Sequence, residues 1–331
     1  MAAIESSMLK LNELPPPEKV TIFNASEGLN RSLIIDCIHQ RGFCIIRGLF
    51  SEKKLNAVLT LAEKYFSTPA IAGAPGYWKV DHPKKLIHPF TLGGKALDLV
   101  LDERVIDIIE SVMGGECILA ETMLKFDKKS KYTYFPLHSD FAVGWSKSGD
   151  HQSMLDIEAL KKVLGIGGAL YLHDTVEGAF RYCDGTHRML SPRGQKFHSY
   201  PKKEQEAMLA RIVCCEGLRG DLILFDDRGF HGPSQPAKEN RTVILLDYFN
   251  VNTIGRTQVA PMPIWSTDIA SLTDKQLRVA GVGANFMVSP MNYAHTRFQH
   301  NKLHKPLAWV IDHAYLPQHF KNLVKHFIKR T

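Results

Sequence analysis

The sequence lacks the features that mark a membrane-spanning or secreted protein. No window approaches the roughly 18 uncharged apolar residues that a membrane helix needs, and no basic N-terminal stretch precedes an apolar segment of the signal-peptide type. The 6 cysteines include no CxxC pair, so neither a zinc ribbon nor a disulfide framework is indicated. We therefore expect a cytoplasmic protein with reduced thiols and no membrane contact.

Long runs of charge are also missing. The chain has 41 Lys and Arg against 34 Asp and Glu, a formal net charge of +7, and its lysines form short clusters such as Lys84 with Lys85 and Lys202 with Lys203. Clusters of this kind are usually solvated surface, although they can also steer an anionic substrate. We expect no nucleic-acid partner.

The chain contains enough apolar sequence for one substantial core, with 331 residues of which 44% are hydrophobic. Residues 1–20 contain three consecutive prolines, Pro15 to Pro17, and are expected to form an irregular arm. Residues 21–331 are expected to form a single domain. Helical spacing is expected over residues 31–40, over 54–66 after Ser51 as N-cap, and over 96–113, with a strand within residues 43–50.

From residue 116 onward the pattern changes to short apolar strands separated by turn residues, which favours an antiparallel sandwich or barrel. Together with the helices this predicts an α+β fold, with the β core at about residues 116–250. The extension 251–331 is expected to be helical and to pack on the barrel or on a second subunit as a homo-oligomer contact. Residues 153–164 are predicted to form a further helix or a lid-like insertion. The stretch from about Ser146 to Gly165, with GIGG at its end, is predicted to be a mobile lid.

One short segment can supply two metal ligands. In YFPLHSDF, His138 and Asp140 are two positions apart, so on a strand both point to the same face. The alternative for this pair is a buried hydrogen-bonded contact, because an isolated HxD is a weak signal. His231, after the apolar run LILF, would complete two histidines and one carboxylate, the facial set that leaves open positions on Fe(II); its alternative is a turn histidine that caps backbone groups.

Arg241 opens the next apolar run, TVILL. A planar guanidinium there can hold the distal carboxylate of a dicarboxylic 2-oxo acid in a bidentate pair, whereas the alternative is an ordinary surface ion pair.

The blocks HSDF (138–141), GAFRYCDGTHR (178–188) and GDLILFDDRGFHGPSQPAKENR (220–241), with GFCIIRGLFSEKKLNAV (42–58), resemble in order and spacing the phytanoyl-CoA dioxygenase family of Fe(II)- and 2-oxoglutarate-dependent oxygenases. The resemblance implies a double-stranded β-helix (jelly-roll, cupin-like) core with flanking N- and C-terminal helices. It also implies iron on His138, Asp140 and His231, 2-oxoglutarate on Arg241, and dioxygen as oxidant.

The chain departs from the family pattern at two positions. Pro233 stands where members often carry a hydroxyl residue that helps to bind the co-substrate, so the second co-substrate contact stays open among Ser234, Thr242 and Thr122, with Met123 nearby. Asp184 replaces a proline in a turn, which we interpret as a turn substitution without chemical weight. Phe141 and Trp145, just beyond the metal ligands, are expected to line the substrate pocket.

These observations favour an Fe(II)- and 2-oxoglutarate-dependent dioxygenase that oxidises, most simply hydroxylates, an unactivated C–H bond of a small metabolite. Succinate and carbon dioxide would be released, and a place in specialised natural-product biosynthesis is expected. Two alternatives stay open: a zinc-dependent hydrolase on the same three ligands, and a jelly roll that binds without catalysis.

Overall fold

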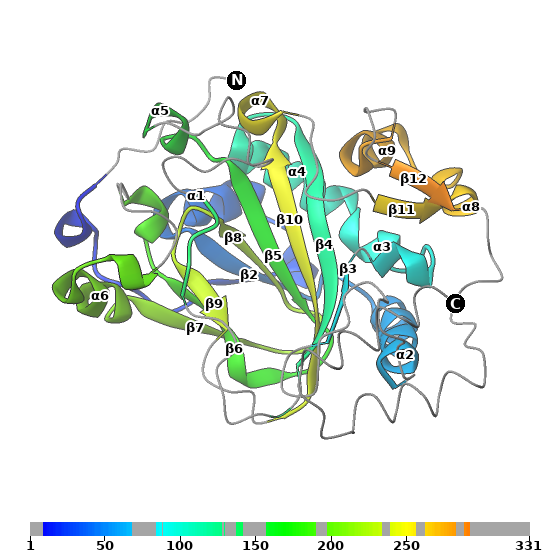
Figure 1. Cartoon of the computed structure of the whole chain (residues 1–331), viewed down its shortest axis with the longest axis horizontal. Helices are drawn as coiled ribbons and strands as arrows, with labels where there is room; N and C mark the ends of the chain where they lie inside the picture. The colour runs from blue at the N-terminus through cyan, green and yellow to red at the C-terminus, as the bar shows by residue number, and fades with distance from the viewer. Residues whose placement is uncertain are drawn as a thin grey trace, which may run out of the picture.

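The computed structural model describes residues 9–67, 84–87, 89–127, 129, 137–141, 157–189, 197–233, 239–255, 262–282 and 288–291. A large, mostly antiparallel sheet runs through its centre (Figure 1). In spatial order its seven strands are β1 (Ile22–Asn24), β2 (Phe43–Arg47), β8 (Leu222–Asp226), β5 (Gly165–Tyr171), β10 (Arg241–Asn250), β4 (Cys117–Asp127) and β3 (Lys84–Ile87).

A small sheet and a helical layer cover the two faces of the large sheet. The small sheet has the order β7 (Ile212–Gly217), β6 (Thr175–Cys183) and β9 (His231–Pro233), and its apolar side chains pack against β2, β5 and β8 in one buried cluster. Helices α1 (Arg31–Arg41) and α4 (Glu103–Met113) contact the large sheet through another cluster. The expected jelly-roll-type, α+β fold is confirmed, and among the residues that the structure describes the sheets do not close into a barrel.

The helices follow local capping signals. The Asn30 side chain accepts a hydrogen bond from Leu33 N at 3.2 Å at the start of α1, and α2 (Glu52–Ser67) follows Ser51 as expected. The prediction of a single helix over residues 96–113 is wrong. Asp102 adopts extended backbone and caps Arg104 N at 3.0 Å, so the segment divides into α3 (Leu97–Val100) and α4.

The prediction of a mobile lid is wrong for its last segment, GIGG. Gly165 begins β5, which lies between β8 and β10 and is buried along its length. A Cβ on Gly167 would overlap the Phe225 ring and the Asp227 carboxylate, so the glycine reflects close packing inside a strand. Ahead of it stands the short helix α5 (Ile157–Leu160), and residues 146–156 lie outside the described residues.

The N-terminal arm is docked on the domain. Leu14 is buried, and Arg211 donates a hydrogen bond to Pro15 O at 2.5 Å. Asp184 is buried, accepts a hydrogen bond from Glu18 N at 3.0 Å and pairs with Arg41 at 2.5 Å. The residue interpreted as a turn substitution therefore joins the arm to the end of α1.

The described part of the C-terminal extension packs on the same domain. It contains α7 (Val251–Ile254), β11 (Met262–Trp265), α8 (Ser266–Ile269), α9 (Asp274–Ala280) and β12 (Val288–Met291). Arg278 of α9 pairs with Glu110 of α4 at 2.7 Å. The helical spacing expected near residues 305–329, and the subunit contact expected there, lie outside the described residues.

Helix α6 (Lys202–Leu209) precedes β7. No helix within the described ranges has the length and apolar character needed to cross a membrane.

Candidate metal centre

Three side chains predicted as metal ligands meet at one point. One ligand atom each from His138, Asp140 and His231 lies within 4.8 Å of the other two. The Nε2 atom of His231 is 3.2 Å from Asp140 Oδ2, and that of His138 is 3.6 Å from Asp140 Oδ1. The group is the only cluster of three or more such side chains with this spacing among the described residues.

Backbone pairing holds the segment that carries His138 and Asp140. His138 N donates to His231 O at 3.0 Å, and His231 N donates to His138 O at 2.8 Å, so the segment is paired with β9 at this position. Asp140 N donates to Asp227 O at 3.0 Å. The buried Ser139 hydroxyl donates to Phe141 O at 2.7 Å and lies 2.9 Å from Arg228 O. These bonds explain why the two ligand side chains share a face.

The turn before β9 orients the imidazole of His231. Its Nδ1 lies 3.0 Å from Gly229 O, so a proton on Nδ1 leaves the lone pair of Nε2 for a metal. The turn is held by a buried ion pair between Arg228 and Asp226 at 2.6 Å. A Cβ at Gly229 would collide with the Tyr182 hydroxyl, so the turn needs glycine there.

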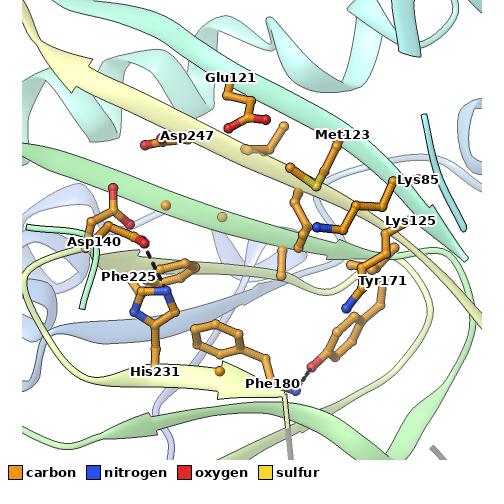
Figure 2. Close-up of a pocket in the computed structure, with 18 of the residues that line it drawn as sticks. Lys85, Glu121, Met123, Lys125, Asp140, Tyr171, Phe180, Phe225, His231 and Asp247 are labelled. Atoms are coloured by element: carbon orange, nitrogen blue, oxygen red, sulfur yellow. Dashed lines mark hydrogen bonds and ion pairs between the residues drawn. The ribbon is translucent and has the colours of Figure 1, made fainter. Parts of the chain in front are cut away.

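The ligand group opens onto a cavity of about 280 Å³ between the two sheets. Figure 2 shows Asp140 and His231 at one end, and Lys125 with Tyr171 toward the other. The lining residues are Lys85, Glu121, Met123, Lys125, His138, Asp140, Gly167, Gly168, Ala169, Tyr171, Phe180, Phe225, Asp227, His231, Gly232, Arg241, Val243, Leu245, Leu246 and Asp247.

The end of the cavity away from the metal ligands, which we call its closed end, carries positively charged side chains. Arg241 Nη2 lies 2.8 Å from Asp127 Oδ2, its Nε donates to the same oxygen at 2.9 Å, and Nη1 contacts the carbonyl of Gly178. Lys125 Nζ is 3.2 Å from Asp127 Oδ1. Burial lowers the pKa of Lys125, Asp127 opposes this shift and Arg241 adds to it. These two cations and one anion together carry one net positive charge when Lys125 is protonated.

The end beside the metal ligands carries three further acidic side chains. Glu121 and Asp247 face the cavity from neighbouring strands (Figure 2), and Asp227 lies next to Asp140. Burial raises the pKa of Glu121, which Lys85 opposes. Burial, together with the charges of Asp247 and Asp140, holds the pKa of Asp227 well above that of an ordinary aspartate.

Several expected site residues take other places. Thr122 donates to Leu245 O at 2.8 Å, Thr242 binds His173 Nδ1 through its backbone N–H, and neither lines the cavity, because each alternates with inward-facing neighbours on its strand. Phe141 packs against Phe249 in a separate cluster. Met123 does line the cavity. Ser234 and Trp145 lie outside the described residues.

Sequence reasoning missed the charged residues of β4. Glu121, Met123, Lys125 and Asp127 alternate along this strand, and the first three line the cavity while Asp127 binds two cations at its closed end. The signal was present, because three charges at positions 121, 125 and 127, which share one face of a strand, interrupt the largely apolar run CILAETMLKFD. Charged groups at alternate positions of a buried strand indicate an inner face with a polar function.

Solved structures share this fold. EctD from S. alaskensis, solved with bound Fe, is 18% identical with a TM-score of 0.55, covering 78% of this chain and 91% of its own. The carbocyclase SnoK from nogalamycin biosynthesis is 14% identical with a TM-score of 0.51, covering 72% and 88%. AviO1 from Streptomyces viridochromogenes Tue57 is 16% identical with a TM-score of 0.50, covering 67% and 96%. At these identities the likeness establishes the fold.

A search of curated proteins finds no match. The family model of phytanoyl-CoA dioxygenase (PhyH), in contrast, matches residues 38–242, which include β2, the three candidate metal ligands and Arg241. This span is more than half of the chain. The chain therefore belongs to the phytanoyl-CoA dioxygenase family, and it is an oxygenase.

Proposed function

We propose that the chain is an Fe(II)- and 2-oxoglutarate-dependent oxygenase that hydroxylates a C–H bond of a small organic molecule. One observation carries the proposal: His138, Asp140 and His231 converge at one end of a cavity whose other end holds Arg241 and Lys125. The structural relatives support it. EctD has been solved with 2-oxoglutarate and 5-hydroxyectoine, and the epimerase SnoN with Fe3+, alpha ketoglutarate and nogalamycin RO.

The donor set fits a ferrous ion. Two imidazole nitrogens and one carboxylate oxygen from one side form the facial arrangement that leaves positions for other ligands. The Asp140 side chain is 44% exposed and the His138 side chain 29%, so the ligand atoms are accessible from the cavity. When bound, Fe(II) with 2-oxoglutarate and dioxygen supplies the oxidising power that converts C–H to C–OH, while the co-substrate becomes succinate and carbon dioxide.

The closed end of the cavity fits the second carboxylate of 2-oxoglutarate. Lys125, Arg241 and Asp127 together carry one net positive charge, which one carboxylate neutralises. The ammonium and the guanidinium would both donate to it, a contact shorter and stronger than one between neutral groups. Arg241 therefore acts with Lys125, a residue for which the sequence analysis assigned no role, rather than as an isolated bidentate clamp.

The remaining lining residues position the substrate and keep water out. Phe180 and Phe225 pack with ring centroids 4.5 Å apart between the metal ligands and Tyr171. The Tyr171 hydroxyl donates to Cys215 O and accepts from Phe180 N, both at 2.9 Å, so its ring is fixed. Rigid apolar walls beside the reacting centre confine the chemistry to one oriented C–H bond.

The proposal includes a role in specialised biosynthesis and a cytoplasmic location. A role in specialised biosynthesis is supported by the shared fold of two enzymes of nogalamycin biosynthesis. A cytoplasmic location is supported by the six cysteines, all of which are free, because thiols stay reduced in that compartment.

An anaerobic titration tests the proposal. Adding Fe(II) and then 2-oxoglutarate to the metal-free protein should produce a visible charge-transfer band that saturates at one equivalent of each. A Zn(II) titration under the same conditions should produce no band. A protein that binds Zn(II) tightly but shows no band with Fe(II) and 2-oxoglutarate would be a hydrolase candidate, and the oxygenase proposal would fail.

A further inference from the structure

Three carboxylates lie along one line across the large sheet at the metal end of the cavity. Glu121 of β4 is the register partner of Asp247 of β10, and Asp247 is in turn the partner of Gly167 of β5. A Cβ on Gly167 would collide with Asp227, which follows β8. All three carboxylates line the cavity (Figure 2 labels Glu121 and Asp247).

This arrangement is unfavourable for the fold alone. Like charges directly opposite each other on paired strands destabilise a sheet. Asp227 is 1% exposed, and its Oδ2 atom has no hydrogen-bond partner in the described part of the chain. A buried carboxylate oxygen without a partner costs free energy. Residues that oppose stability in this way cluster at binding sites, so a ligand is the expected source of compensation.

The charge of the loaded cavity gives the sign of that ligand, and this step rests on the proposed function. Fe(II) with Asp140 and one carboxylate of 2-oxoglutarate is neutral, and the closed end neutralises the second carboxylate. Outside that end, the described lining residues include one lysine, Lys85, to balance Glu121, Asp227 and Asp247. Even with one proton shared between the two aspartates, one negative charge beside the metal is not balanced by any of the described lining residues.

The spacing and the neighbours of the three carboxylates indicate an organic cation rather than a metal ion. The three carboxylates do not meet the 4.8 Å mutual spacing that the metal ligands meet within the described residues. Apolar side chains stand among them, including Phe225, whose ring centroid is 4.6 Å from that of His231. An aromatic face and separated carboxylates suit a cationic nitrogen attached to a hydrocarbon body.

We propose that the substrate of this oxygenase carries a protonated amine or another organic cation, and that Glu121, Asp227 and Asp247 bind it beside the metal. Asp227 is not one of the three ligand residues, but it is adjacent to them, because its backbone carbonyl accepts a hydrogen bond from Asp140 N at 3.0 Å. The cation would therefore be fixed next to the reacting centre, and the oxidised C–H bond would lie near the charged nitrogen.

Three probes with one ring and different charge test this inference. Cyclohexylammonium, cyclohexanol and cyclohexanecarboxylate would be titrated into the anaerobic complex with Fe(II) and 2-oxoglutarate, with Kd measured by calorimetry and by the change in the charge-transfer band. The cation should bind at least about tenfold more tightly than the alcohol, because it gains hydrogen bonds to charged acceptors. The carboxylate should bind most weakly.

Matched variants locate the preference. Glu121→Gln and Asp247→Asn keep the shape and should each reduce the preference for the cation over the alcohol about tenfold, while the Kd of the alcohol changes little. Glu121 is only partly buried, so its variant is expected to fold even if Asp247→Asn does not. Asp98→Asn, on the exposed side of α3, alters net charge equally and should leave the preference unchanged.

The two proposals fail in distinguishable ways. If no band forms with Fe(II) and 2-oxoglutarate, the oxygenase proposal fails before any probe is added. If the band forms but the three probes bind equally, or if the preference for the cation survives in Glu121→Gln, the cation site is refuted and the oxygenase stands.

Discussion

Arg241 and Asp127 are register partners at the ends of β10 and β4, and their side chains are bonded to each other: both Nε and Nη2 of the arginine lie within 2.9 Å of Asp127 Oδ2. The arginine therefore presents only part of its guanidinium to the cavity, beside the ammonium of Lys125. This pairing makes the co-substrate end of the cavity a three-residue unit, in which each member affects the other two.

Arg241→Ala should raise the 2-oxoglutarate concentration needed for half-saturation by about one to two orders of magnitude, since a hydrogen bond to a charged group contributes roughly 1.5–3 kcal/mol. Arg241→Lys should restore part of the loss. Titration of the charge-transfer band measures the effect, and iron affinity should barely change. Pyruvate, which lacks the distal carboxylate, serves as control. Equal losses for the two acids would show that Arg241 does not bind the distal carboxylate.

Lys125 should make 2-oxoglutarate binding depend on pH. Burial lowers its pKa, so its ammonium loses the proton at a lower pH than an ordinary lysine does, and binding should weaken as the pH rises through that pKa. Arg in place of Lys125 stays protonated, so Lys125→Arg should remove the weakening. The measurement is the Kd of 2-oxoglutarate across the alkaline range. Superimposable profiles for the two proteins would contradict the assignment.

Asp140→Ala should abolish tight Fe(II) binding without unfolding the protein. Changes to outer-shell partners alone cost roughly 10–100-fold in metal affinity, and removal of a direct ligand should exceed that. Asp140 is partly exposed, so its loss leaves no large void. Iron content after anaerobic loading and the far-UV circular dichroism spectrum measure the two effects, with the exposed Asp98→Ala as control. Normal iron content in Asp140→Ala would remove this residue from the ligand set.

The sequence predicted the parts of the fold and site that depend on local pattern. The strands β4, β5, β6, β8 and β10 follow short apolar runs, and the spacing of two between His138 and Asp140 indicated a shared face. The contact between Arg241 and Asp127 depends instead on the pairing of two strands, because the two residues are 114 positions apart in the sequence. No local pattern specifies that register, so the closed end of the cavity could not be assembled from the sequence.

The GIGG segment also shows that contacts distant along the chain cannot be predicted from local pattern. Glycines near a polar stretch are typical of a mobile loop, and the sequence alone gave no reason to prefer a central strand. The reason lies in side chains distant along the chain, because Asp227 and Phe225 occupy the space above Gly165 and Gly167. The lid prediction was wrong at this end because glycine allows close packing as well as flexibility.

Asp226→Asn should destabilise the turn that carries His231. Asp226 and Arg228 are buried and bonded at 2.6 Å, and removing one partner of such a pair costs about 3–5 kcal/mol. The midpoint of thermal unfolding should fall by roughly 6–20 °C. Replacing Arg228 by Met in the same chain should recover part of the loss, because no unpaired charge is then left buried. A double variant as unstable as the single one would contradict this account.

The same ion pair predicts a change of stability with acid. Burial raises the pKa of Asp226, but the charge and hydrogen bonds of Arg228 lower it more, so the net shift is downward. A carboxylate with a depressed pKa contributes stability above the pKa of the unfolded state, and that contribution is lost as the pH falls through the folded value. The difference in unfolding midpoint between the wild type and Asp226→Asn should therefore shrink at low pH.

Gly167→Ala should damage both stability and the site, whereas Gly168→Ala should be much milder. The added methyl at 167 would overlap the Phe225 ring and Asp227 at 2.3–2.5 Å, whereas at 168 its nearest contacts would be Leu246 Cδ1 and Cβ at 3.2 and 3.3 Å and Ile223 O at 3.4 Å. Overpacking of a core typically costs 1–3 kcal/mol. Denaturant unfolding measures that cost, and the preference of the loaded protein for cyclohexylammonium over cyclohexanol measures the displacement of Asp227. Because the two glycines are adjacent on β5 and gain the same methyl, equal effects at both would show that strand propensity, rather than the space reserved for Asp227 and Phe225, explains the glycines.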